Sequence, residues 1–437
     1  MDAVLSDADW HLRSRTSGTV VKIVKARNLW RDIAFAAWSC ADPGVQFDTT
    51  INEWHTCPAD GRINASNPCS EYLFLDDTAC NLASLNLIRF YDDAAKVFDT
   101  VSFEHACRIW TVVLDISVQM AQFPSREIAR KSWEFRTLGL GYCNLGALLM
   151  RMGLAYGSDQ ALAVTGGITA IMCGKAYATS AEMAEELGSF PGYQRNSNAM
   201  LRVLENHRQA AWGTTRYEGL STAPRAIDHA LCPSEISAAA KTSWDKAMTL
   251  GQQYGFRNAQ VTALAPTGTI GLLMDCDTMG IEPEFALVKS KRLAGGGHFK
   301  IVNHSVSVGL KGLGYSTSQI DDIMKHCLGH GSLVGCQSIS HERLKTLGFT
   351  DESIAKVENL FASALELESV FSPQNLGVDF CQRHLGLSIV ELKASDANVL
   401  KLLGVNHEDI DTASHYVFGS MTLEGAPHIG NDHLAVF

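Results

Sequence analysis

A short stretch of the chain places three chemically complementary side chains within five residues. In Asn67-Pro68-Cys69-Ser70-Glu71 an amide, a thiol and a carboxylate stand at alternate positions, and a second thiol, Cys80, follows the first by eleven residues. If the stretch is extended, every second side chain points the same way, so the three groups would share one small space. Pro68 lacks the N–H that a central strand requires, which favours a rigid loop inside a pocket. A lone buried cysteine is usually inert, but a thiol beside an amide and a possible base indicates a reactive site.

A second candidate site follows a predicted strand in the middle of the chain. Residues 259–264 are strand-like, and the chain then turns through Pro266, Thr267, Gly268, Thr269 and Ile270. Hydroxyl and backbone N–H groups at such a turn can hold a phosphate without a lysine, especially where a helix begins. The turn does not have the Gly-x-x-x-x-Gly-Lys-Ser/Thr pattern of a Walker A loop. Taken alone, it is equally well explained as a plain Pro-Thr-Gly turn.

The elements that would position these sites alternate between strands and helices. Residues 135–142 are predicted to form a buried strand whose glycines permit another backbone or a ligand to approach closely. Long helices are expected from about 158 to 188 and from about 234 to 254. This alternation is typical of an α/β sheet or barrel, in which ligands gather at the carboxyl ends of the strands. Another helix, over 102–120, is expected to form one face from Ala106, Trp110, Val113, Ser117 and Met120.

From about residue 306 the sequence predicts a subdomain of short, capped helices. A Leu-Gly pair followed by an apolar residue and a capping residue occurs three times, with Ser316, Thr350 and Asn406 in the capping position. Each occurrence is typical of a glycine that ends one helix and an N-cap that begins the next. The three occurrences are irregularly spaced, so they do not indicate a solenoid.

Composition and charge exclude several classes of protein. The 437 residues carry a net charge of −11 without a block of like charge, which argues against binding of a nucleic-acid polymer. The twelve cysteines include no Cys-x-x-Cys, which disfavours a zinc finger or a self-contained thioredoxin-like pair, and no metal site is assigned. The acidic N-terminus is not a signal peptide, and no apolar run is expected to approach a membrane span. A cytoplasmic protein with free thiols and no membrane contact is therefore expected.

An NAD-type α/β dehydrogenase is a weaker alternative. Gly139-x-Gly141-x-x-Asn144 superficially resembles a dinucleotide-binding fingerprint. The third glycine is missing, and the two that are present lie inside the predicted strand, whereas the fingerprint places them after it.

Taken together, the motifs resemble the catalytic subunit of ribonucleotide reductases. The resemblance is carried by the stretch from Asn67 to Glu71, by the segments 80–87 and 136–141, and by the loop at 266–269. The flanking segments 42–48 and 280–283 are most similar to the adenosylcobalamin-dependent (class II) branch of that family. The similarity extends from near residue 10 to the C-terminus.

The resemblance implies an α/β fold with a specific architecture. Residues 1–305 would form part of a ten-stranded α/β barrel, with a finger loop around Cys69 and a phosphate loop around Thr267. Residues 306–437 would form the helical subdomain. Adenosylcobalamin would be the cofactor that generates the radical.

The resemblance also implies a role for each candidate residue in the reduction of a ribonucleotide to a 2′-deoxyribonucleotide. Cys69 would become a thiyl radical, Glu71 would be the general base, and Asn67 would hold the substrate. Cys80 would be one member of a redox-active dithiol, which a thioredoxin- or glutaredoxin-like reductant would reset. Residues 266–270 would bind the substrate phosphates.

The sequence departs from the family pattern at both ends. In the family the other reducing cysteine lies well upstream of the Asn-x-Cys-x-Glu motif, and neither Cys40 nor Cys57 has a matching context. The family also continues into further barrel strands and a C-terminal cysteine pair. We therefore expect an internal piece of a longer enzyme, completed by another chain or a second copy. A non-catalytic remnant, or one half of a split enzyme, is the alternative.

Overall fold

The structure of the chain is a computed structural model that describes residues 1–284, 286, 288–292, 298–394 and 397–437. These residues divide into two compact units. Residues Met1–Trp54 and Leu220–Thr222 form unit 1, and residues His55–Gly219 and Ala223–Phe437 form unit 2. All the predicted site residues belong to unit 2.

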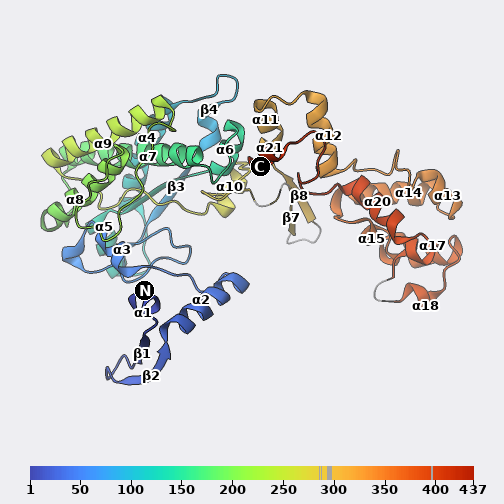
Figure 1. The fold of residues 1–437 in the computed structure, drawn as a ribbon, viewed down its shortest axis with the longest axis horizontal. Coiled ribbons are helices and arrows are strands. Elements are labelled where there is room, and N and C mark those ends of the chain that lie inside the picture. Colours follow the sequence, from blue (N-terminus) through green and yellow to red (C-terminus); the bar gives the residue numbers. More distant parts are fainter. Residues whose placement is uncertain (285, 287, 293–297, 395–396) are drawn as a thin grey trace. The chain divides into compact units, whose positions relative to one another are not determined.

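Unit 1 is built from short helices and one β-hairpin (Figure 1). Its elements are α1 (Asp2–Leu5), β1 (Asp9–Arg13), β2 (Val20–Lys25), α2 (Ala26–Cys40) and α3 (Asp48–Glu53). Ala26 is its one buried residue, whereas Phe35 and Trp38 are 65% and 81% exposed. Because burial of apolar surface is the main stabilising term in folding, unit 1 has little core of its own.

Parallel pairing around one strand forms the centre of unit 2. Strand β3 (Asn81–Asn86) lies parallel to β6 (Leu138–Cys143) on one side. On the other side residues 259–264 run parallel to β6, and the backbone N–H of Leu138 donates to Gln260 O at 2.8 Å. The first predicted strand is thus confirmed from residue 138 onward, whereas residues 259–264 run beside it with one isolated β-bridge at Thr262 and do not form a regular strand. Every residue of β6 is buried, as expected for a central parallel strand, but the described residues form no closed barrel.

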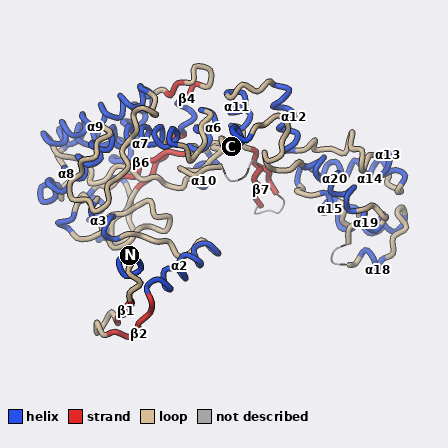
Figure 2. Tube along the Cα trace, in the orientation of Figure 1, coloured by secondary structure: helices blue, strands red, loops and turns tan. Residues whose placement is uncertain are grey.

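Long helices pack around these strands (Figure 2). They are α4 (Thr100–Met120), α5 (Arg126–Phe135), α6 (Leu145–Met152), α7 (Asp159–Leu187), α8 (Tyr193–Ala211) and α9 (Ser234–Tyr254). Helices α7 and α9 lie side by side, and α4 contacts α7. Their close approach depends on Gly174, where a Cβ atom would lie 3.0 Å from the backbone N of Trp244. The bounds of α7 and α9 confirm the two long helices predicted from the sequence.

Helix α4 buries a face other than the one that the sequence pattern singled out. Its buried residues are Phe103, Cys107, Thr111, Leu114, Asp115 and Val118. On the predicted face, Trp110 is 43% exposed and Met120 is 78% exposed. The N-cap is Asp99, whose carboxylate accepts from the backbone N of Ser102. Apolar residues occur around most of this helix, so its contacts with α7, β3 and β6 select the buried face.

Helix α7 contradicts the expectation that no apolar run approaches a membrane span. Its length and composition would allow it to cross a membrane. However, 61% of its most apolar window is buried inside the protein. In this structure it is a core helix.

Short helices make up the C-terminal region, and most of them have a side-chain N-cap. They are α11 (Ser305–Gly312), α12 (Thr317–Leu328), α13 (His341–Thr346), α14 (Asp351–Leu360), α15 (Leu367–Val370), α16 (Pro373–Leu376), α17 (Val378–Arg383), α18 (Ile389–Leu392), α19 (Val399–Leu402), α20 (His407–Phe418) and α21 (Asn431–Leu434). Ser316, Thr350 and Asn406 are the N-caps of α12, α14 and α20, and Ser316 forms a capping box with Gln319. The remaining elements are η1 (Pro58–Asp60), η2 (Leu87–Phe90), β4 (Tyr91–Asp92), β5 (Val97–Phe98), α10 (Gly268–Leu273), β7 (Val288–Arg292), β8 (His298–Val302) and η3 (Phe361–Ser363).

Candidate active site

The stretch from Asn67 to Glu71 forms a tight turn at the tip of a loop. Ser66 and Leu73 pair in an antiparallel bridge, and the backbone N–H of Ser70 donates to Asn67 O at 3.0 Å. Ser70 has a φ of 65°, so the stretch is not extended. A common direction for the three side chains therefore does not follow from strand periodicity. The structure shows a loop at Pro68 in place of a strand, with Cys69 exposed at its tip.

The side chain of Asn67 stabilises this turn. Its Oδ1 accepts a hydrogen bond from the backbone N–H of Tyr72 at 3.0 Å. Asparagine commonly closes turns in this way, because its short amide reaches the backbone a few residues further on. Asn67 does not line the cavity that contains Cys69 and Glu71, and no hydrogen bond of its Nδ2 group is found within the described part of the chain.

A hydroxyl network attaches the returning arm of the loop to the central strand. Tyr72 donates its hydroxyl proton to Thr78 Oγ1 at 2.8 Å and lies 3.0 Å from Thr137 Oγ1. Thr137 in turn donates to the backbone O of Ala79 at 2.8 Å. Burial raises the pKa of Tyr72 above its ordinary value, so the phenol remains protonated at neutral pH. These hydrogen bonds therefore attach the end of the loop to the chain immediately before β6.

Cys69 and Glu71 line one cavity of about 690 Å³. Its other walls come from α7, α8 and α9 and from the end of the segment at 262–264, and they include Cys173, His207 and Trp244. Sequence reasoning did not find these three residues, which lie more than a hundred positions from Cys69 and have no local motif. Ligand sites often occur in cavities of this size between helices and strand ends.

The carboxylate of Glu71 has an oxygen atom that is free to accept a hydrogen bond from a ligand. Its Oε2 atom is buried and has no hydrogen-bond partner among the residues that the structure describes. A buried polar atom without a partner is costly, so an unsatisfied carboxylate oxygen in a cavity wall indicates a missing donor. A ligand hydroxyl would supply that donor.

The helical wall of the cavity is nearly uncharged at neutral pH. The ring of His207 stacks on Trp244 with centroids 5.3 Å apart, and burial lowers the pKa of His207 to about 4. Cys173 Sγ lies 3.5 Å from Thr262 Oγ1, and burial raises the pKa of this thiol to about 11. Arg225 is the basic lining residue, and its guanidinium lies 2.7 Å from the Asp159 carboxylate.

Cys80 lies immediately before β3 and packs over the central strand. A Cβ atom on Gly139 would stand 2.6 Å from Cys80 Sγ, so the glycine makes room for the thiol. Burial raises the pKa of Cys80 to about 12, and the Glu71 carboxylate contributes to the shift in the same direction. Cys80 is therefore a protonated thiol at neutral pH and is electrostatically linked to Glu71. It does not line the same cavity as Cys69.

The predicted phosphate loop leads directly into a short helix. Thr267 has a φ of 53°, and α10 begins at Gly268. Thr267 is buried, and its Oγ1 accepts from the backbone N–H of Gly280 at 2.7 Å, which fixes the turn. Pro266, Gly268, Thr269 and Ile270 are exposed. None of the five lines the cavity, although Leu264 just before them does.

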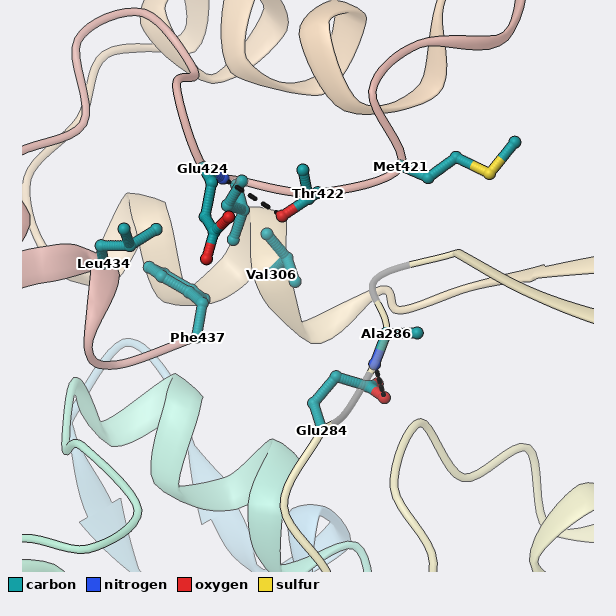
Figure 3. A pocket seen from close by; sticks show the side chains of 9 residues that line it. Glu284, Ala286, Val306, Met421, Thr422, Glu424, Leu434 and Phe437 are labelled. Atoms are coloured by element: carbon teal, nitrogen blue, oxygen red, sulfur yellow. Dashed lines mark hydrogen bonds between the residues drawn. The ribbon is translucent and has the colours of Figure 1, made fainter. Parts of the chain in front are cut away.

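A smaller cavity of about 270 Å³ lies elsewhere in unit 2 (Figure 3). Its lining includes the carboxylates of Glu284 and Glu424 and the apolar side chains of Val306, Leu434 and Phe437. None of its lining residues is basic, which makes it unsuited to an anionic ligand. It also contains none of the predicted site residues.

Comparison of the sequence with models of known families identifies the class of protein to which these strands and the cysteine-bearing loop belong. The family model for the ribonucleotide reductase barrel domain matches residues 7–349. The chain therefore belongs to this family, and the resemblance noted from the sequence motifs is confirmed.

Individual relatives narrow the similarity within the family. The chain is 55% identical over all 437 residues to a vitamin B12-dependent ribonucleotide reductase of Agrobacterium fabrum, of which it covers 34%. It is 53% identical over its full length to the corresponding protein of Bradyrhizobium diazoefficiens, of which it covers 35%. A vitamin B12-dependent ribonucleoside-diphosphate reductase of Mycobacterium tuberculosis is 29% identical over 279 residues. The chain spans about a third of the length of the first two relatives.

Proposed function

We propose that this chain carries the radical site of an adenosylcobalamin-dependent ribonucleotide reductase. The reaction converts a ribonucleotide and two thiols into a 2′-deoxyribonucleotide, water and a disulfide. The observation that carries the proposal is the cavity that Cys69 and Glu71 share, in which a buried Glu71 oxygen has no partner among the described residues. The family membership and the names of the relatives support the same reaction.

Each side chain has a role that fits its environment. Cys69, as a thiyl radical, abstracts the 3′-hydrogen of the ribose, while Glu71 accepts the 3′-hydroxyl proton. The Nδ2 group of Asn67 donates to the substrate, because its Oδ1 is already bonded to Tyr72 N. The turn at 266–270 binds the phosphates through its exposed backbone N–H groups and Thr269, since the Thr267 hydroxyl is bonded to Gly280.

The residues of the chain fit the proposed cofactor. Adenosylcobalamin supplies a carbon-centred radical when it is bound. The matching requirement on the protein is an accessible thiol that is not bonded elsewhere. Cys69 is exposed, and within the described part of the chain its Sγ has no hydrogen-bond partner. No group of three or more described His, Cys, Asp or Glu side chains could hold a metal ion, but cobalamin carries its own cobalt.

Cys80 supplies one reducing equivalent of the pair. Its raised pKa keeps the hydrogen on sulfur until the substrate radical requires it. The second thiol, the downstream strands of a ten-stranded barrel and the regulatory sites would come from further polypeptide, either a complementing chain or a second copy. We infer that a thioredoxin- or glutaredoxin-like protein in the cytoplasm resets the disulfide.

Exposed apolar surface on α4 supports the proposal that further polypeptide packs against this chain. The helix α4 exposes Val113, Ile116 and Met120 to 42%, 53% and 78%. These three residues are spaced at helical intervals and form a continuous apolar stripe, which monomeric proteins normally cover.

Product formation tests the proposal. The chain is incubated with adenosylcobalamin, dithiothreitol and each ribonucleoside di- or triphosphate, alone and mixed with a chain that supplies the missing barrel strands. Deoxyribonucleotide is measured by chromatography. We expect product in the mixture and none with Cys69→Ser, whereas the matched variant of another exposed cysteine, Cys40→Ser, retains it. Product formation by Cys69→Ser, or none by the wild-type mixture, refutes the proposal and in the second case favours a non-catalytic remnant.

A further inference from the structure

We propose that Cys143 and Cys276 form a reversible oxidation site, in which a hydroperoxide converts the two thiols into a disulfide. Their Sγ atoms lie 3.2 Å apart, although the residues are 133 positions apart in the chain. Disulfide sulfurs stand about 2.05 Å from each other, so an approach of roughly 1 Å completes the bond. Within the described residues this is the one direct contact between two thiols, and it is separate from the cavity at Cys69.

Hydrogen bonds of the neighbouring residues hold the two cysteines side by side. Cys143 is the last residue of β6, and the adjacent Asn144 accepts from the backbone N–H of Thr278 through its Oδ1 at 2.9 Å. Thr278 Oγ1 accepts from the backbone N–H of Ala147 at 3.1 Å. Because Thr278 is only two residues beyond Cys276, these bonds fix one thiol beside the other. The pair can therefore close without a large rearrangement.

The two thiols differ in the way that sequential oxidation requires. Cys276 is 9% exposed, whereas Cys143 is fully buried. The hydrogen bond between the two thiols lowers the pKa of Cys276, while the same bond together with burial raises the pKa of Cys143. Cys276 is thus the less deeply buried of the two thiols and has more thiolate character, which is the form that reacts with peroxides. Cys143 is positioned to react second.

The chemistry balances in two steps. The Cys276 thiolate attacks the terminal oxygen of the hydroperoxide, the O–O bond breaks, and an alcohol (water from hydrogen peroxide) leaves after it gains a proton. The Cys143 thiol then attacks the sulfenic sulfur of Cys276, the S–O bond breaks, and a second water leaves with the thiol proton. A dithiol reductant reverses the change by thiol–disulfide exchange.

The disulfide would join two parts of the fold that carry the site. Cys276 N donates to Gly271 O of α10 at 2.9 Å, and α10 begins at the predicted phosphate loop. Cys143 ends the strand that lies beside residues 259–264. Oxidation would therefore tie the segment that leaves the loop to the central strand.

Peptide mapping of the full chain tests the site. The protein is treated with a small excess of hydrogen peroxide, free thiols are blocked with N-ethylmaleimide in denaturant, and trypsin digestion is performed without reductant. Cys143 and Cys276 are the single cysteines of the tryptic peptides 137–151 and 258–289. We expect these peptides as one linked species, two hydrogens lighter than their sum, that dithiothreitol separates. Cys107, a buried thiol in peptide 97–108, is the internal control and should remain fully blocked.

Single variants establish the order of the steps. In Cys143→Ser, dimedone should label Cys276, because the sulfenic acid has no partner thiol. In Cys276→Ser, Cys143 should remain unlabelled. If both cysteines of the wild-type protein are blocked by N-ethylmaleimide as completely after peroxide as before, the proposal is wrong. Oxidation of Cys107 to the same extent, or dimedone labelling of Cys143 in Cys276→Ser, also overturns it.

Discussion

Replacement of Asp115 by Asn should destabilise the protein because it removes the charge at the centre of a buried network. Asp115 is 4% exposed and Arg136 is 1% exposed. Asp115 Oδ1 accepts from Arg136 Nε at 2.8 Å and from Asn258 Nδ2 at 2.8 Å. Its second oxygen, Oδ2, lies 3.7 Å from Arg257 Nε. Arg136 precedes β6 and Asn258 precedes the segment at 259–264, so one carboxylate anchors the beginnings of two neighbouring parallel segments.

The expected loss follows from what the amide can and cannot replace. The carbonyl oxygen of an asparagine can still accept from Arg136 and Asn258, which retains part of the hydrogen bonding. The amide nitrogen would then face Arg257 Nε, donor against donor, and the buried guanidinium of Arg136 and the partly buried one of Arg257 would lose their counterion. Removal of one partner from a buried ion pair typically costs 3–5 kcal/mol, so we expect a loss of about 3 kcal/mol in the free energy of unfolding.

Urea unfolding monitored by circular dichroism measures this loss from the shift in midpoint at unchanged slope. Asp159→Asn is the matched control, because Asp159 also pairs with an arginine, Arg225, at 2.7 Å but both side chains are about 70% exposed. Exposed pairs contribute about 0–1 kcal/mol, so the control should change little. Equal shifts for the two variants would refute the reasoning, as would a loss below about 1 kcal/mol for Asp115→Asn.

Two further predictions concern the central strand and the pH dependence of stability. In Gly141→Ala the new Cβ would lie 2.4 Å from Ala263 O, so β6 and the segment beside it must separate. We expect the free energy of unfolding, measured in urea, to fall by about 1–3 kcal/mol. Gly157→Ala, whose Cβ would meet nothing within 4 Å, should be nearly neutral, and equal losses for the two variants would contradict the argument. Burial lowers the pKa of His55 to about 4, so its stabilising contribution is complete above the ordinary pKa of about 6.5 and should fall by roughly 3 kcal/mol between that pH and 4, because the unfolded chain binds the proton first. Unfolding measured from pH 7 to 4.5 should show a shallower slope for His55→Asn, and identical slopes would count against the assignment.

Local patterns in the sequence predicted what local physics controls. The caps at Ser316 and Thr350 and the two long helices depend on residues within a few positions of each other, and they are confirmed. The sequence pattern did not identify the buried face of α4, because apolar residues surround the helix and only its packing partners decide between faces. The walls of the cavity at Cys69 and the contact between Cys143 and Cys276 join residues more than a hundred positions apart. No pattern in one sequence specifies such long-range pairings.

The turn at the tip of the finger loop separates two requirements that an extended strand would have combined. A radical-accepting thiol must be reachable from a bulky cofactor, whereas a base must be shielded from water to act on one substrate hydroxyl. With Ser70 at positive φ, the chain reverses between Cys69 and Glu71, so the thiol is exposed while one oxygen of the carboxylate is buried. The Glu71 charge also helps to keep the Cys80 thiol protonated. The carboxylate proposed as the base therefore also favours the protonated form of Cys80, the thiol proposed as one of the reductants.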